Sequence, residues 1–238
     1  IAISNSVTSI GRAFLVACPN LTSITVESGN SKYDSRDNCN AIIETATNTL
    51  ISGCKSTIIP NTVTSIGEYA FDGCTGMTSI SIPNSVTSIG KSAFSECQFP
   101  VLHLPESVTS VGTSNKCADI CYCYNPTPPT GGGYTSDRLY VPKGSLTAYA
   151  TAEGWKTAKQ ILEFDADDIA KPILTIAYPE GGVIKQEVDN GEILKLQIVA
   201  ANGWKCHSAT FNGTDVTNQI DINGYYNTPS ITANSQLN

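Results

Sequence analysis

The sequence predicts a solenoid of short stacked coils followed by a small all-β domain, and three observations support this fold class. Nearly the same wording occurs twice in succession, as "STIIPNTVTSIGEYAFDGCT" at 56–75 and "SISIPNSVTSIGKSAFSECQ" at 79–98. Each copy carries too few apolar side chains to be stable by itself, so neighbouring copies must bury each other's faces. Beyond residue 172 the repeat gives way to strand-like runs separated by turns rich in glycine and asparagine.

The repeat recurs about every 23 residues, a period that falls within the range of leucine-rich repeats. A longer, divergent copy lies between Glu27 and Lys55. Because Ile1–Gly11 aligns with Ile80–Gly90, we expect the chain to begin inside a repeat, without the upstream part of the protein. The second half of the repeat occurs at Val7–Cys18, Val63–Cys74, Val86–Cys97 and, in decayed form, Val108–Cys117.

Apolar residues alternate in the first half of each copy, which predicts a short strand. The Pro-Asn pair predicts a turn, Val-Thr-Ser-Ile a second extended piece, and Ala-Phe-x-x-Cys a short helical turn. In a stack of such coils, Ile59, Ile82 and Leu104 should line up as rungs of one apolar spine. The expected strands are 21–26, 56–60, 77–83, 101–105 and, as the last of the series, 138–142.

The end of the solenoid is expected to be closed by a helix. Proline and glycine are dense between 121 and 133, which predicts an extended loop. Apolar residues between 144 and 161 then have the spacing of an amphipathic helix. We expect Tyr149 and Trp155 to pack beneath this helix, and a ligand-stacking role for their rings is the alternative.

Two domains are predicted, joined by a short acidic linker. The solenoid should span 1–165, with its C-terminal cap at about 137–162, and a small β module should span 172–238. Short strand-like runs separated by turns predict an immunoglobulin-like sandwich for this module. Its expected task is spacing or anchoring, and ligand binding is the alternative.

The composition excludes some classes of partner. Charged residues make up 15% of the chain and its formal net charge is −7, with no concentration of Lys or Arg. Nucleic acid and anionic lipid surfaces are therefore not expected partners. No apolar run approaches the roughly 20 residues that cross a bilayer, so this chain is not expected to insert into a membrane.

Nine cysteines raise the question of disulfides and metals. Cys18, Cys74 and Cys97 share one phase of the repeat, so stacking should point them inward in parallel, a poor geometry for a disulfide. We expect mostly free, buried thiols. A Cys39–Cys54 disulfide is the alternative in the divergent copy, and zinc bound by Cys117, Cys121 and Cys123 is the alternative in the third cluster.

Other candidate chemistry is sparse, and neither an enzyme nor a cofactor is expected. The two histidines, His103 and His207, are isolated and predict no nucleophile–histidine–acid arrangement. Asp34 and Asp37 lie in a turn-rich stretch, where capping of turns is expected and a weak calcium site is the alternative. The glycines form no phosphate loop between a strand and a helix.

The wording "IPNSVTSIG…AF…C…LTSI" closely resembles the BspA-like leucine-rich repeat of bacterial cell-surface proteins. The stretches "YDSRDNCNAIIETATNTLISGC" and "RLYVPKGSLTAYATAEGWK" resemble that family too, the second as its C-terminal cap. The resemblance covers about residues 1–165. It implies an extracellular location on the bacterial surface and adhesion to host or microbial partners. More weakly, the last segment resembles small β modules that follow such repeats.

Alternation along the expected strands predicts an exposed strand face. If Ile80 and Ile82 point inward, Ser79 and Ser81 point outward, and the same register continues through the later coils. Arginine and tyrosine on this face are residue types enriched in binding hot spots. The candidate partner-binding residues are Ser79, Ser81, Val101, His103, Arg138 and Tyr140.

We therefore expect a non-enzymatic surface protein that binds a protein or glycan through its strand face. The first alternative is a structural spacer or display stalk whose binding region lies upstream. The second is an accessory part of a secreted enzyme. The sequence identifies neither the ligand nor the oligomeric state.

Overall fold

In a computed structural model, the chain divides into two compact units, Ile1–Ile169 and Ala170–Asn238. Each unit is described by itself. The structure describes residues 1–115, 118–132, 136–165, 173–177, 183–187, 195–197, 210–212, 214–219, 225–228 and 235–237.

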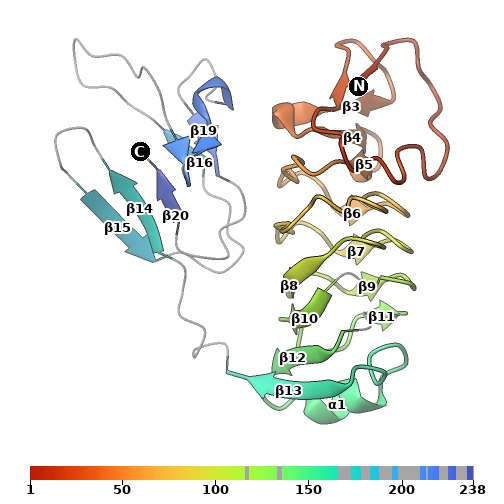
Figure 1. Cartoon of the computed structure of the whole chain (residues 1–238), viewed down its shortest axis with the longest axis vertical. Coiled ribbons are helices and arrows are strands. Elements are labelled where there is room, and N and C mark those ends of the chain that lie inside the picture. The colour runs from red at the N-terminus through yellow and green to blue at the C-terminus, as the bar shows by residue number, and fades with distance from the viewer. Residues whose placement is uncertain are drawn as a thin grey trace. The chain divides into compact units, whose positions relative to one another are not determined.

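The first unit is a solenoid whose coils stack into two main sheets (Figure 1). The larger sheet has the order β11-β9-β7-β6-β5-β4-β3 within the described residues, and it is parallel from β5 to β11. Its strands are β3 (Tyr33–Asp34), β4 (Ala41–Glu44), β5 (Thr49–Gly53), β6 (Ser65–Ile66), β7 (Ser88–Ile89), β9 (Ser110–Val111) and β11 (Thr130–Gly131).

The smaller sheet is entirely parallel and has the order β13-β12-β10-β8. It belongs to the last coils, on the other side of the solenoid from β9 and β11 (Figure 1). Its strands are β8 (Phe99–Leu104), β10 (Ala118–Cys123), β12 (Arg138–Pro142) and β13 (Gln160–Phe164). In the first coils, β1 (Ala2–Ile3) pairs in parallel with β2 (Thr25–Val26).

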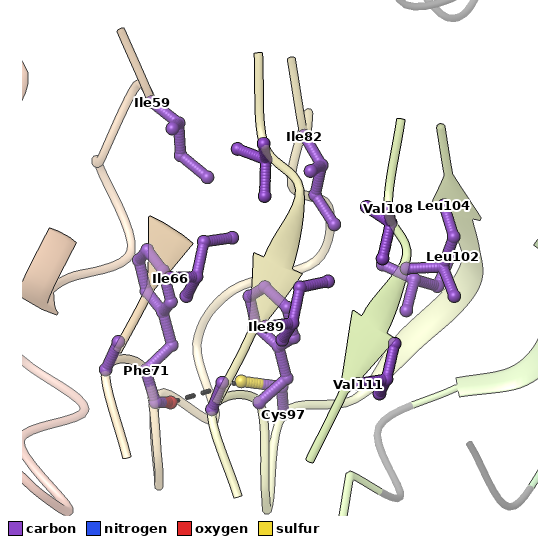
Figure 2. Packing of buried hydrophobic residues seen from close by; sticks show 14 of the residues in the cluster. Ile59, Ile66, Phe71, Ile82, Ile89, Cys97, Leu102, Leu104, Val108 and Val111 are labelled. Carbon is purple, nitrogen blue, oxygen red and sulfur yellow. Dashed lines mark hydrogen bonds between the residues drawn. The ribbon is translucent and has the colours of Figure 1, made fainter. Parts of the chain in front are cut away.

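An apolar core runs through the stack from Cys39 to Trp155, as the repeat predicts, and a second apolar cluster around Ile24 and Ile42 fills the first coils. Ile59, Ile82 and Leu104 are all buried in the first of these, and Figure 2 shows them at successive positions of the core. Ile66 pairs in register with Ile89, and Ile89 in turn pairs with Val111. Equivalent residues of consecutive copies therefore bury one another, which is how coils too small to be stable alone form a stable array.

The strands expected at 56–60 and 77–83 are not formed. The alternation there places Ile59 and Ile82 in the core, but the interstrand pairing runs through the Thr-Ser-Ile segments instead. Pro60 and Pro83 carry no backbone N–H to donate to a ladder. These segments thus bury Ile59 and Ile82 without strand pairing.

The Ala-Phe-x-x-Cys segments, expected as short helical turns, are hydrogen-bonded turns that form no regular helix: the backbone N–H of Cys74 donates to the carbonyl of Phe71 at 3.0 Å. These segments are successive turns that stack on one another: the backbone N–H of Phe71 donates to the carbonyl of Ala93 at 2.8 Å. Tyr69 and its equivalent Ser92 have φ values of 59° and 52°. Left-handed residues bend the backbone out of a helix, and hydrogen bonds between coils add to those within each turn.

The segment expected as an extended loop from 121 contains strand β10, which inserts between β8 and β12. Of the stretch 144–161, expected as a helix, only α1 (Leu146–Thr151) is helical. Trp155 is fully buried, and its indole N–H donates to the carbonyl of Pro129 at 2.8 Å.

Among the described residues, six cysteines carry free thiols, and all of them except Cys18 are buried: Cys18, Cys39, Cys54, Cys74, Cys97 and Cys123. Cys39 and Cys54, the alternative disulfide pair, each direct the thiol to a backbone carbonyl, that of Ala41 and Asn40 respectively. Cys117, part of the alternative zinc cluster, lies outside the described residues, while Cys121 and Cys123 point into the core.

The described residues of the second unit are strands and one short 3-10 helix, η3 (Thr217–Gln219). One sheet has the order β15-β14-β20-β17-β18, and β16 pairs with β19. The immunoglobulin-like arrangement and His207 fall largely or wholly outside the described residues, and the arrangement stays a prediction. The strands are β14 (Ile173–Ala177), β15 (Val183–Glu187), β16 (Lys195–Gln197), β17 (Thr210–Phe211), β18 (Thr214–Asp215), β19 (Tyr225–Asn227) and β20 (Ser235–Leu237).

Candidate binding face

The outward side of the smaller sheet carries a concentration of aromatic side chains, which we call the aromatic face. Its members are set by the register of four parallel strands, because alternate residues of each strand point to the same side. The intervening residues Leu102, Cys121 and Leu139 point inward and are buried. The aromatic face consists of Val101, His103, Ile120, Tyr122, Tyr124, Arg138, Tyr140, Leu162 and Phe164.

Three rings stack across neighbouring strands of this face. His103 on β8 lies opposite Tyr122 on β10, with centroids 5.1 Å apart and an interplanar angle of 10°. Tyr122 lies opposite Tyr140 on β12, with a separation of 4.5 Å and an angle of 11°. The sheet spacing itself aligns the rings, because directly opposite side chains in adjacent strands are close neighbours.

Phe164 closes one border of this row. Its ring meets Tyr122 edge to face, with centroids 5.6 Å apart, and meets Tyr124 in the same way at 5.3 Å. Leu162, opposite Tyr140 on the outermost strand, has 37% of its surface exposed. Apolar surface thus extends across all four strands of the sheet.

His103 is held in a defined, neutral position. Its Nδ1 atom lies 3.0 Å from the hydroxyl oxygen of Tyr124, in hydrogen-bond contact. Burial lowers the pKa of His103 below its ordinary value of 6.5, because a charged imidazole loses hydration there. The group therefore adds polarity to the face at neutral pH but no charge.

Arg138 is the one charged side chain of the aromatic face. It is exposed, and none of the ion pairs formed within the described residues involves it. The nearby carboxylate of Asp137 pairs with Lys159 at 2.8 Å. Glu163 instead accepts hydrogen bonds from the backbone N–H groups of Gly144 and Leu146.

The structure brings together four of the six residues predicted from the sequence: Val101, His103, Arg138 and Tyr140. Ser79 is exposed and Ser81 half-buried, but within the described residues no strand pairing joins either of them to β8. The face therefore begins at β8 and does not continue as a sheet through the preceding coil.

Sequence reasoning missed Ile120, Tyr122, Tyr124, Leu162 and Phe164. The signal for the first three was present in "ICYCY" at 120–124, where large side chains alternate with cysteines. The density of proline and glycine immediately downstream outweighed that alternation. The sequence therefore predicts a loop where the structure has β10, the strand at the centre of the face.

The calcium alternative at Asp34 does not fit the geometry. Both carboxylate oxygens of Asp34 accept hydrogen bonds from Arg36, at 2.8 Å from Nε and 2.6 Å from Nη2. The backbone N–H of Arg36 also donates to Asp34 at 3.1 Å, which is a capped turn. A cation would have to displace this bidentate pair.

Comparison with protein families gives one match, to the family described as "BspA type Leucine rich repeat region (6 copies)". It covers residues 1–54 and 50–122, together more than half of the chain. No curated protein matches the chain. Within the described residues, no helix has both the length and the apolar character needed to cross a membrane.

Two solved structures match the chain at low sequence identity. A leucine-rich repeat protein from Eubacterium ventriosum ATCC 27560 has 18% identity and a TM-score of 0.49, over 74% of this chain and 50% of that chain. The pneumococcal vaccine antigen PcpA has 15% identity and a TM-score of 0.43, over 69% of this chain and 55% of that chain. The chain thus spans about half the length of these solved relatives.

Proposed function

Because the chain belongs to the BspA-type leucine-rich repeat family, whose members are often surface proteins, we propose that it is a non-enzymatic protein of the bacterial cell surface. In this proposal the solenoid mediates adhesion by binding a protein or a glycan through the aromatic face. The solenoid supplies a rigid support, and the last coils supply the contact residues.

The observation that carries the proposal is the row of rings on the smaller sheet. His103, Tyr122 and Tyr140 are each only partly buried, although their apolar surface would be more stable inside a core. Tyrosine and arginine are enriched where binding energy concentrates at interfaces. The row also lies on strands, which hold side chains more precisely than loops do.

The experiment is a binding survey with the whole chain and a matched variant. The chain is tested in pull-downs against extracellular matrix proteins and on a glycan array. The triple variant His103→Ala, Arg138→Ala, Tyr140→Ala should lose binding by at least about tenfold, because truncating hot-spot residues costs more than about 1–2 kcal/mol each. Circular dichroism must show that the triple variant is still folded.

A control triple variant lies on another surface of the same solenoid. Thr64, Thr87 and Thr109 are exposed next to strands β6, β7 and β9, and their change to Ala should leave binding intact. Equal loss in both variants would contradict the proposal. Binding by neither the wild type nor the variants would instead favour a spacer or display stalk whose binding region lies elsewhere in the protein.

A further inference from the structure

The stacking of the rings limits what kind of partner the aromatic face can take. Tyr122 occupies the middle strand of the row, with His103 on one side and Tyr140 on the other. Both faces of the Tyr122 ring are therefore covered by near-parallel neighbours. What the row presents outward is ring edges and hydroxyl tips.

This arrangement is poorly suited to a sugar and well suited to a protein surface. Sugars bind aromatic residues by laying their C–H groups on an open ring face, and the central ring has none. Ring edges with polar tips, flanked by Leu162 and Ile120, match the mixture of apolar contact and hydrogen bonding found at protein–protein interfaces.

The charge of the aromatic face further restricts the kind of protein segment that can bind there. Arg138 gives the aromatic face a single positive charge on a chain whose net charge is −7. Two carboxylates at the border of the sheet are already bound, Asp137 by Lys159 and Glu163 by two backbone N–H groups, while Asp119 on β10 is exposed. The guanidinium group offers a planar pair of donors that a carboxylate accepts in bidentate fashion.

We propose that the aromatic face recognises an acidic protein segment that places a carboxylate on Arg138 and apolar side chains against Tyr122, Tyr140 and Leu162. The inference rests on the proposed binding function and adds the chemical class of the partner. Arg138 orients the segment, and the ring edges and Leu162 contribute the apolar contact area.

The test is a selection of random linear peptides displayed on phage against the immobilised whole chain, followed by affinity measurements on the selected peptides. Selected sequences should carry Asp or Glu beside aliphatic or aromatic residues. Arg138→Gln should weaken binding at least about tenfold, because it removes the charge-assisted hydrogen bonds to the peptide's carboxylate. Arg12→Gln is the matched control, because it removes an exposed charge from a turn segment outside the face.

A double-mutant cycle makes the assignment specific. Replacing the peptide's carboxylate by its amide should weaken binding to the wild type as much as Arg138→Gln does. For the Arg138→Gln variant, the same peptide change should cause no further loss of affinity.

Additive losses, or selected peptides without acidic residues, would overturn the inference. Binding only on a glycan array, abolished by changes in the face, would overturn it and leave the proposed function standing. If the chain bound neither the peptide library nor the glycan array, both the inference and the proposed binding function would be contradicted.

Discussion

A β-carbon on Gly90 would lie 2.5 Å from the backbone nitrogen of Glu68 in the preceding coil. Gly112 stands in the same relation to Lys91, at 2.3 Å. These two glycines, which end Val-Thr-Ser-Ile-Gly at 86–90 and Val-Thr-Ser-Val-Gly at 108–112, therefore allow adjacent coils to approach within backbone contact. No side chain can be added there without separating the coils.

Gly90→Ala should lower the free energy of unfolding by about 1–3 kcal/mol, as expected when extra volume is forced into a packed site. Gly11 holds the same position in the first copy, but a β-carbon there would meet nothing within 4 Å. Gly11→Ala should therefore be close to neutral in urea denaturation. Similar effects of the two changes would show that the coils are not packed as described.

Phe94→Ala should destabilise the solenoid by about 3–5 kcal/mol, because the ring is fully buried and its removal leaves a cavity. Phe94 stacks on its repeat equivalent Phe71, with centroids 5.4 Å apart. Phe14 is the natural control, since 47% of its surface is exposed. Phe14→Ala should cost less than about 1 kcal/mol, and thermal or urea unfolding of both variants checks the ranking.

The neutral state of His103 predicts a loss of stability in mild acid. Burial lowers the folded-state pKa of His103, so the unfolded chain binds more protons in the interval below pH 6.5. The stability that neutral, buried His103 contributes to the folded state is fully present above pH 6.5 and is lost as the pH falls through the folded-state pKa.

His103→Phe keeps a ring against Tyr122 but cannot titrate. The free energy of unfolding of the wild type minus that of the variant, measured from about pH 7 to about pH 5, should decrease as acid is added. Other groups titrate equally in both proteins and cancel. A constant difference across the range would contradict the prediction.

Thiol reactivity should follow burial along the solenoid. Burial raises the pKa of Cys97 and of Cys39 to about 12, and that of Cys74 to about 11, so little reactive thiolate forms at neutral pH. Cys18 is partly exposed. Brief alkylation with iodoacetamide followed by peptide mass mapping should label Cys18 well before the other three. Equal labelling in the native state, as expected only after denaturation, would contradict the burial of these thiols.

The repeating apolar positions could be predicted from the sequence because stacking forces equivalent residues into the same surroundings. Ile59, Ile82 and Leu104 were assigned to the core on this ground, and all three are buried. Which extended segments pair as strands could not be predicted in the same way. The alternation in the sequence marks Ile82 as a core residue, and Ile82 is buried although no strand pairing among the described residues includes it.

The candidate face was only half predictable for a related reason. Val101, His103, Arg138 and Tyr140 follow from carrying the repeat register forward. Tyr122 lies in a stretch that no longer resembles the repeat, so its position cannot be aligned with the strands of the other copies. Its position depends on β10 inserting between β8 and β12, a long-range pairing that local composition does not encode.

The near-parallel phenol rings of Tyr122 and Tyr140 also give the protein an optical signature of its own. Chromophores fixed in a chiral mutual orientation couple their electronic transitions and give near-ultraviolet circular dichroism, which freely rotating rings lack. A molecule that wedged between the two phenols would abolish this band, whereas one seated on their hydroxyl groups would leave it in place. The manner of engagement could thus be followed in solution without any label.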